Sequence, residues 1–170
     1  MTSRVEIREE RSSDVKAIGE VIDSAFSGMS YADGDEAELV EALRSHDSLS
    51  VSLVAELEGT IVGQIAFSPA QVSGGAAGWY ALGPVAVLPA HQGGGIGSAL
   101  IRSGLQAVIE LGASGCILTG APAYYSRFGF TLSCENAPPG EPAEYFMVKL
   151  LRGDLPSGPI RFHEAFGGAA

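Results

Sequence analysis

The chain has 170 residues, 46% of them hydrophobic and 18% charged, which is typical of one globular domain. Acidic residues outnumber basic ones, and the formal net charge of −10 argues against nucleic acid or an anionic membrane as partner. The sequence has neither an apolar run of membrane-spanning length nor the apolar centre of a signal peptide. We therefore expect a cytoplasmic protein with one domain over 1–170, a core over about 4–151 and a tail over 152–170.

The first part of the chain predicts a strand, two helices and a hairpin. Residues 4–9 alternate as a strand does, and apolar residues over 15–26 recur at helical spacing after Ser12 or Ser13, either of which can cap that helix. A second helix is predicted over 36–46. Two strand-like runs within 50–70 flank Glu58-Gly59, a pair typical of a tight hairpin turn.

The middle of the chain predicts a strand, a glycine-rich loop, a helix and a second strand. The apolar run 79–89 is followed by the loop, by a helical stripe over 99–112 and by a short buried strand over 115–120. This order indicates a right-handed βαβ unit with two parallel strands.

The last part of the chain predicts a short helix within 121–130 that Gly129 closes, and a final strand over 144–151. Residues 71–78 and the proline-rich segment 133–143 are expected to be loops. The turn-rich tail is expected to fold back as an edge.

The stretch HQGGGIGSAL, residues 91–100, places glycines directly before a helix. The N-terminus of a helix offers unpaired N–H groups and a partial positive charge, and glycines let an anion approach the backbone. The stretch does not match a P-loop, because Ser98-Ala99 follows Gly97 in place of Lys-Ser/Thr. The glycine spacing also fails the dinucleotide fingerprint.

Gln92 to Gly97 reads Q-G-G-G-I-G and resembles the Q/R-x-x-G-x-G/A signature of the GNAT N-acetyltransferase superfamily. The segments VAVLP upstream and YYSRFGF downstream stand where that family has them. The phrases DEAELVEALR, LGPVAVLPAHQGGGIGSAL and APAYYSRFGF resemble the bacterial YhbS-type branch in particular. The resemblance implies an α/β fold whose mixed, mostly antiparallel sheet of six to seven strands has helices on both faces and a splayed central parallel pair.

By this resemblance the cofactor is acetyl-CoA, bound mainly by backbone groups, and no metal is implied. The resemblance implies that the pyrophosphate is bound by the backbone amides of seven consecutive residues, Gln92, Gly93, Gly94, Gly95, Ile96, Gly97 and Ser98. The resemblance implies that the pantetheine arm is bound by the backbone of Val85, Ala86 and Val87, beside a bulge expected at Gly83-Pro84. Many relatives carry Arg or Lys in this loop, and here Arg127 or Arg102 is the alternative source of positive charge.

The resemblance also implies that a tyrosine protonates the departing CoA thiolate, and Tyr125 occupies that position, four residues before Gly129. Its neighbour Tyr124 is the alternative, because adjacent helical residues point about 100° apart and only one can face the sulfur. Trp79 and Tyr80 either line the acceptor pocket or pack in the core.

The implied activity is direct acetyl transfer to a primary amine of an unidentified small molecule or peptide. Glu36, Asp33, Asp35, His91 or a water chain are the alternatives for the general base, and a covalent route through Cys116 is disfavoured. A non-catalytic acyl-CoA sensor is the alternative function, and whether the chain forms a homodimer is left open.

Overall fold

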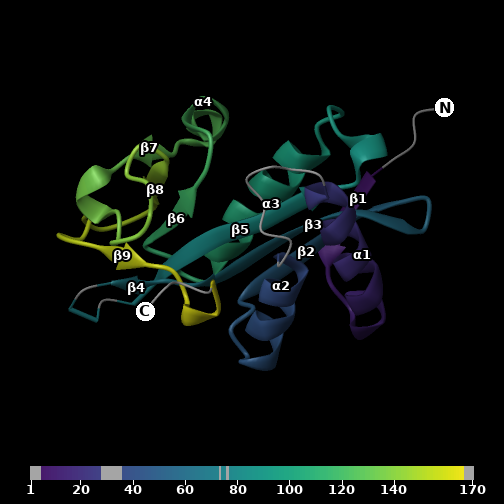
Figure 1. Cartoon of the computed structure of the whole chain (residues 1–170), viewed down its shortest axis with the longest axis horizontal. Coiled ribbons are helices and arrows are strands. Elements are labelled where there is room, and N and C mark those ends of the chain that lie inside the picture. Colours follow the sequence, from purple (N-terminus) through teal and green to yellow (C-terminus); the bar gives the residue numbers. More distant parts are fainter. Residues whose placement is uncertain (1–4, 28–35, 73, 76, 167–170) are drawn as a thin grey trace. The chain divides into compact units, whose positions relative to one another are not determined.

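The computed structural model describes residues 5–27, 36–72, 74–75 and 77–166 (Figure 1). These residues form two compact units, the first made of Met1–Phe67 with Gly83–Gln106 and the second of Ser68–Leu82 with Ala107–Ala170. Strand β5 (Trp79–Val87) and helix α3 (Ile96–Glu110) each run from one unit into the other. No helix in the described ranges is both long enough and apolar enough to cross a bilayer.

A seven-stranded sheet has the order β1-β2-β3-β5-β6-β8-β7. Strands β5 and β6 are parallel, with Trp79 opposite Gly115, and the registered pairs of β1 with β2, β2 with β3, β6 with β8 and β7 with β8 are antiparallel. The predicted fold class, a mixed and mostly antiparallel sheet with one parallel pair, is confirmed. The other strands of the sheet are β1 (Val5–Glu9), β2 (Val51–Leu57), β3 (Thr60–Pro69), β6 (Gly115–Thr119), β7 (Thr131–Leu132) and β8 (Phe146–Leu150).

The predicted hairpin is strands β2 and β3, which Glu58 and Gly59 connect. Both turn residues have positive φ, 50° and 81°, as the tight hairpin turn with the twist of the sheet requires. A register shift after Ala55 marks an irregularity close to the turn.

In the first unit, helices α1 (Val15–Phe26) and α2 (Glu36–Ser45) pack on one face of the sheet and α3 on the other. Ala66 of β3 belongs to the core cluster under α1 and α2, whereas its neighbour Phe67 faces α3. A Cβ atom added at Gly104 of α3 would clash with the ring of Phe67. Only glycine at this position lets α3 lie so close to the sheet.

In the second unit, a core cluster that includes Trp79 and Phe146 joins β5, β6 and β8 to a small two-stranded sheet of β4 (Gln71–Val72) and β9 (Ile160–Arg161). The fully buried Asn136 donates hydrogen bonds to the carbonyls of Pro156 and Gly158, 2.9 and 2.8 Å away. These bonds hold the segment that leads into β9. The remaining elements of this unit are α4 (Pro122–Tyr125), η3 (Ser126–Phe128), η4 (Cys134–Asn136) and η5 (Glu164–Phe166).

Some predicted boundaries are wrong for identifiable reasons. Helix α3 begins at Ile96 and not at 99, because the carbonyl of Gly95 already accepts the N–H of Ala99 at 3.0 Å. Ser12 and Ser13 do not cap α1 but lie in a 3-10 turn, η1 (Ser12–Asp14). The expected loop 71–78 contains β4, and the tail folds back to pair with that strand in a separate two-stranded sheet.

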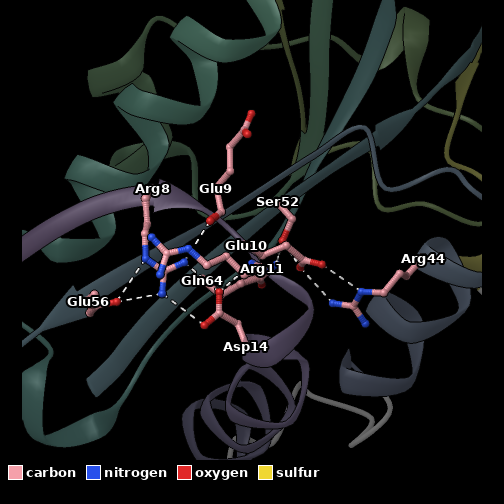
Figure 2. Close-up of polar contacts among 9 residues, drawn as sticks. All are labelled: Arg8, Glu9, Glu10, Arg11, Asp14, Arg44, Ser52, Glu56 and Gln64. Atoms are coloured by element: carbon pink, nitrogen blue, oxygen red, sulfur yellow. Dashed lines mark hydrogen bonds and ion pairs between the residues drawn. The ribbon is translucent and has the colours of Figure 1, made fainter. Parts of the chain in front are cut away.

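An ion pair between the half-buried Arg8 and the buried Asp14 joins β1 to the start of α1 (Figure 2). Arg8 donates to Asp14 through both terminal nitrogens, at 2.8 and 3.1 Å, and also reaches Glu56, with its nearest contact at 2.7 Å. Asp14 is only 7% exposed and also accepts the N–H of Arg11. Hydrogen bonding to Arg8 outweighs the effect of burial and holds the pKa of Asp14 below its ordinary value.

A second polar chain joins α2 to the sheet. Arg44 of α2 donates to both carboxylate oxygens of Glu10, at 3.0 and 2.9 Å, and Glu10 in turn accepts the Ser52 hydroxyl (Figure 2). Ser52 also accepts the side-chain amide of the fully buried Gln64. Hydrogen bonding to Glu10 raises the pKa of Arg44, so the guanidinium group stays positively charged in this contact.

We expect Asp14→Asn to lower the free energy of unfolding at pH 7 by about 1–3 kcal/mol, because Arg8 keeps Glu56 but loses the carboxylate of Asp14, which also accepts the N–H of Arg11. A carboxylate with a depressed pKa stabilises the fold above the pKa of the unfolded state and loses that contribution as the pH falls through the folded value. The difference between wild type and variant should therefore be full at pH 7 and shrink below about pH 4. Urea unfolding across this pH range measures it.

Glu9→Gln is the matched control, because Glu9 is exposed and its side chain points away from the Arg8 cluster in Figure 2. It removes one carboxylate of the same strand and should leave stability within about 0.5 kcal/mol of wild type. Equal losses in the two variants would contradict the role given to the ion pair of Arg8 with Asp14.

Candidate active site

The first group of predicted site residues forms an exposed turn between β5 and α3, which we call the glycine loop (Gln92–Gly95). All four residues are exposed. Gly93 and Gly95 have φ values of 82° and 90°, a left-handed conformation that side chains disfavour, and an added Cβ at either would meet no atom within 4 Å. The open side of this loop is therefore backbone.

Helix α3 starts directly after the glycine loop. Gly95 is its N-terminal boundary, and the buried side chain of Ile96 fastens the first turn to the unit's core. The N–H groups of Ile96, Gly97 and Ser98 belong to this first turn, where no helical carbonyl can accept them. Together with the helix dipole, they make the start of α3 a favourable place for an anion.

Gln92 does not follow the pattern of the glycines. Its side-chain Nε2 donates to the carbonyl of Val87 at 2.9 Å, and its main-chain N–H is directed at the carbonyl of Pro89, 3.4 Å away. Residues Pro89–His91 between these contacts form the 3-10 turn η2. The sequence predicted a backbone role for Gln92 and missed its side-chain bond, which no local pattern signals.

Strand β5 leads into the glycine loop. Ala86 is buried among side chains of α1 and α2, whereas Val85 and Val87 are half-buried. The registered pairs of β5 with β6 run from Trp79 to Ala81 and lie before Gly83-Pro84. The bulge expected at that dipeptide stays a prediction; the structure has a cis peptide bond there.

In the second unit, Tyr125 ends helix α4 within a group of aromatic rings. Its ring centroid lies 5.0 Å from that of Tyr124 and 6.3 Å from that of Phe130, both in near-perpendicular orientation. A Cβ at Gly120 would be 2.5 Å from Cε2 of Tyr125, so the ring rests directly on the Gly120 backbone. Gly129 closes the following turn η3 as predicted, with φ of 89°.

Arg127, the alternative source of positive charge, has its guanidinium carbon 4.9 Å from the centroid of the Tyr124 ring. The two side chains form a cation–π contact within the second unit. Tyr124 thus has a cation–π partner in Arg127.

The remaining predicted residues fall in different places. Cys116 is 0% exposed, and burial raises the pKa of its thiol to about 12, so it does not supply a thiolate at neutral pH. Trp79 is buried in the core rather than lining a pocket. Glu36 is the first residue of α2 and His91 the last of η2, and both are half-buried. Asp33 and Asp35 lie outside the described residues.

Comparison with known proteins explains this arrangement. The family model described as Acetyltransferase (GNAT) family matches residues 16–130, which include the glycine loop, the start of α3 and Tyr125. The chain belongs to the GNAT acetyltransferase family. It is 36% identical over 146 residues to the uncharacterized N-acetyltransferase YhbS of Escherichia coli, a match that covers 81% of this chain and 86% of that protein.

Two crystal structures resemble this GNAT acetyltransferase along nearly its whole length. A GNAT family acetyltransferase from Brucella melitensis in complex with acetyl-CoA is 44% identical with a TM-score of 0.86, covering 96% of this chain and 98% of that one. YhbS from Escherichia coli in complex with CoA is 32% identical with a TM-score of 0.85, covering 98% and 94%. The predicted family and its YhbS-type branch are confirmed, and the chain is an acyltransferase.

No group of three or more His, Cys, Asp or Glu side chains within the described residues is arranged to hold a metal ion. The structure does show an exposed loop with open backbone before α3 in one unit, and a tyrosine ring held by aromatic packing in the other.

We expect Gly120→Ala to displace the Tyr125 ring, because the added methyl cannot fit 2.5 Å from it. The cost should be about 1–3 kcal/mol of unfolding free energy, as for other overpacked sites. In a Tyr125→Ala background the same change should cost much less, since the clashing ring is gone. A double-mutant cycle by urea unfolding measures this difference.

Gly19→Ala is the control, since a Cβ at this position of α1 meets nothing within 4 Å and alanine favours a helix. It should be neutral or stabilising. If Gly120→Ala costs the same with and without the Tyr125 ring, the ring does not depend on this glycine.

Proposed function

We propose that this GNAT acetyltransferase transfers the acetyl group of acetyl-CoA directly to a primary amine of a small molecule or peptide. The observation that carries the proposal is the exposed glycine loop at the start of α3, whose open side consists of backbone. The relatives of known structure support it, because the Brucella protein binds acetyl-CoA and YhbS binds CoA.

The residues fit the pyrophosphate of CoA through amides rather than charge. Positive φ at Gly93 and Gly95 leaves the peptide groups of the loop uncovered, and the first turn of α3 adds the N–H groups of Ile96, Gly97 and Ser98. With Arg127 stacked on Tyr124, the proposed cradle relies on amides and the helix dipole. We assign the pyrophosphate to the backbone from Gly93 to Ser98, with Gln92 at its edge.

The pantetheine arm is assigned to the backbone of Val85, Ala86 and Val87. Ala86 holds this part of β5 in the core, so its main chain has a fixed position. The registered pairs with β6 lie earlier in the strand, at Trp79 to Ala81. The arm is assigned to the part of β5 that follows Gly83-Pro84.

Tyr125 is assigned as the general acid that protonates the departing thiolate. Its ring is fixed by Gly120 and by the aromatic neighbours, and fixed geometry is what proton transfer requires. The buried, protonated thiol of Cys116 supports direct transfer, because a covalent acetyl carrier would need an accessible thiolate.

Acetyl-CoA at about 100 times its Kd should raise the melting temperature by about 5–10 °C, because it binds only the folded state. Differential scanning fluorimetry measures the shift, and release of free CoA with a panel of primary amines then identifies the acceptor. Gly95→Val should abolish the shift by closing the loop. Gly75→Val is the matched control, since Gly75 also has a positive φ (82°) and open space but lies in another loop.

Absence of any shift at millimolar acetyl-CoA would refute the donor assignment. A shift without CoA release for any amine would instead favour a non-catalytic acyl-CoA sensor.

Tyr125→Phe should lower kcat by about 10²-fold or more while leaving the Kd for acetyl-CoA nearly unchanged, because it removes the phenolic hydroxyl that donates the proton and keeps the ring. Tyr124→Phe is the matched control and should retain kcat within about twofold. Steady-state kinetics with the amine found by the panel measures both. If Tyr124→Phe carries the loss and Tyr125→Phe does not, the two roles are exchanged.

A further inference from the structure

The side chain of Gln92 bridges the two ends of the turn that separates β5 from the glycine loop. Its Nε2 donates to the carbonyl of Val87, five residues earlier and the last residue of β5, at 2.9 Å. Both residues belong to the first unit. The glycine loop is thus tied by a side chain to the strand assigned to the pantetheine arm.

Main-chain bonds hold the base of this turn. The N–H of Leu88 donates to Val62 of β3 at 2.9 Å, and that of His91 to Leu88 at 2.8 Å. The N–H of Gln92 is directed at Pro89 over 3.4 Å, beyond the usual range for a hydrogen bond. The side-chain bond of Gln92, at 2.9 Å, is therefore stronger than its main-chain contact and restrains the first residue of the loop.

The glycines that follow Gln92 are the reason why a hydrogen bond at this position can affect ligand binding. Glycine loses more conformational freedom on ordering than any other residue, and three glycines follow Gln92 in succession. A ligand that has to order them itself binds more weakly by that cost. An anchor at Gln92, together with the start of α3 at Ile96, fixes both ends of the run before the ligand arrives.

Resting on the proposed function, we propose that Gln92 is a positioning residue: its side chain preorganises the glycine loop for pyrophosphate by bonding Val87 and does not itself contact CoA. The chemistry of the position agrees. Glutamine and arginine both carry an N–H donor on a long side chain. Glutamate and methionine are similar in length and have no such donor.

The experiment compares Gln92→Met, which keeps the length without the donor, with Gln92→Arg, which keeps a donor. Calorimetric titration should show the Kd for acetyl-CoA raised about 3- to 10-fold in the Met variant and within about twofold of wild type in the Arg variant. With S-acetylpantetheine, which lacks the pyrophosphate, the Met variant and wild type should have equal Kd values.

A second measurement uses the free protein and separates positioning from direct contact. The ¹⁵N order parameters of Gly93, Gly94 and Gly95 should fall toward the flexible range, below about 0.6, in Gln92→Met and recover in Gln92→Arg. A side chain that only touches the ligand would leave them unchanged. This readout also discounts any direct attraction of the Arg variant for phosphate.

Three results would overturn the proposal. These are an unchanged Kd for acetyl-CoA in Gln92→Met, an equal loss with S-acetylpantetheine, or unchanged order parameters in the free protein. Failure of the proposed function has a different signature, because wild type itself would then not bind acetyl-CoA.

Discussion

The close packing of α3 on the sheet is the constraint on which the donor site depends. Gly104 lets the helix approach the Phe67 ring, and at Gly63 on β3 an added Cβ would lie 3.0 Å from Leu100 and 3.3 Å from Ile96. Small residues at both contacts fix the axis of the helix, and the axis fixes where its unpaired N–H groups point. In an anion site made of backbone, no side chain can rotate to adjust the position of the donors. The positions of the N–H groups therefore depend on how the helix packs against the sheet.

Glycine has two distinct physical roles in this chain. At Gly93 and Gly95 it permits a backbone conformation that exposes peptide groups to a ligand. At Gly104 and Gly120 it permits close approach, to Phe67 and to the Tyr125 ring. The first role creates the surface that we propose for the pyrophosphate, and the second positions the elements that carry the proposed site residues. Gln92 complements both, because a hydrogen-bonding side chain restrains the freedom that the loop glycines bring.

Much of the fold could be predicted from local patterns. The hairpin at Glu58-Gly59, the amphipathic helix α1 and the turn closed by Gly129 each depend on residues a few positions apart. Strands β4 and β9 could not be predicted, because each has two residues and exists only through pairing with the other, far along the chain. The start of α3 was misplaced because glycines at its first turn resemble a loop until Gly95 is seen to accept the N–H of Ala99.

The sequence by itself determined the family and the donor chemistry, because an anion cradle of backbone requires a run of glycines before a helix and such a run is visible in one dimension. Tertiary structure alone decided which side chains serve that cradle. Cys116 and Trp79 are buried in the core. Arg127 contacts the ring of Tyr124, and the side chain of Gln92 donates a hydrogen bond to the carbonyl of Val87. Burial and hydrogen-bond geometry arise only when the chain is folded, so local sequence patterns do not predict them.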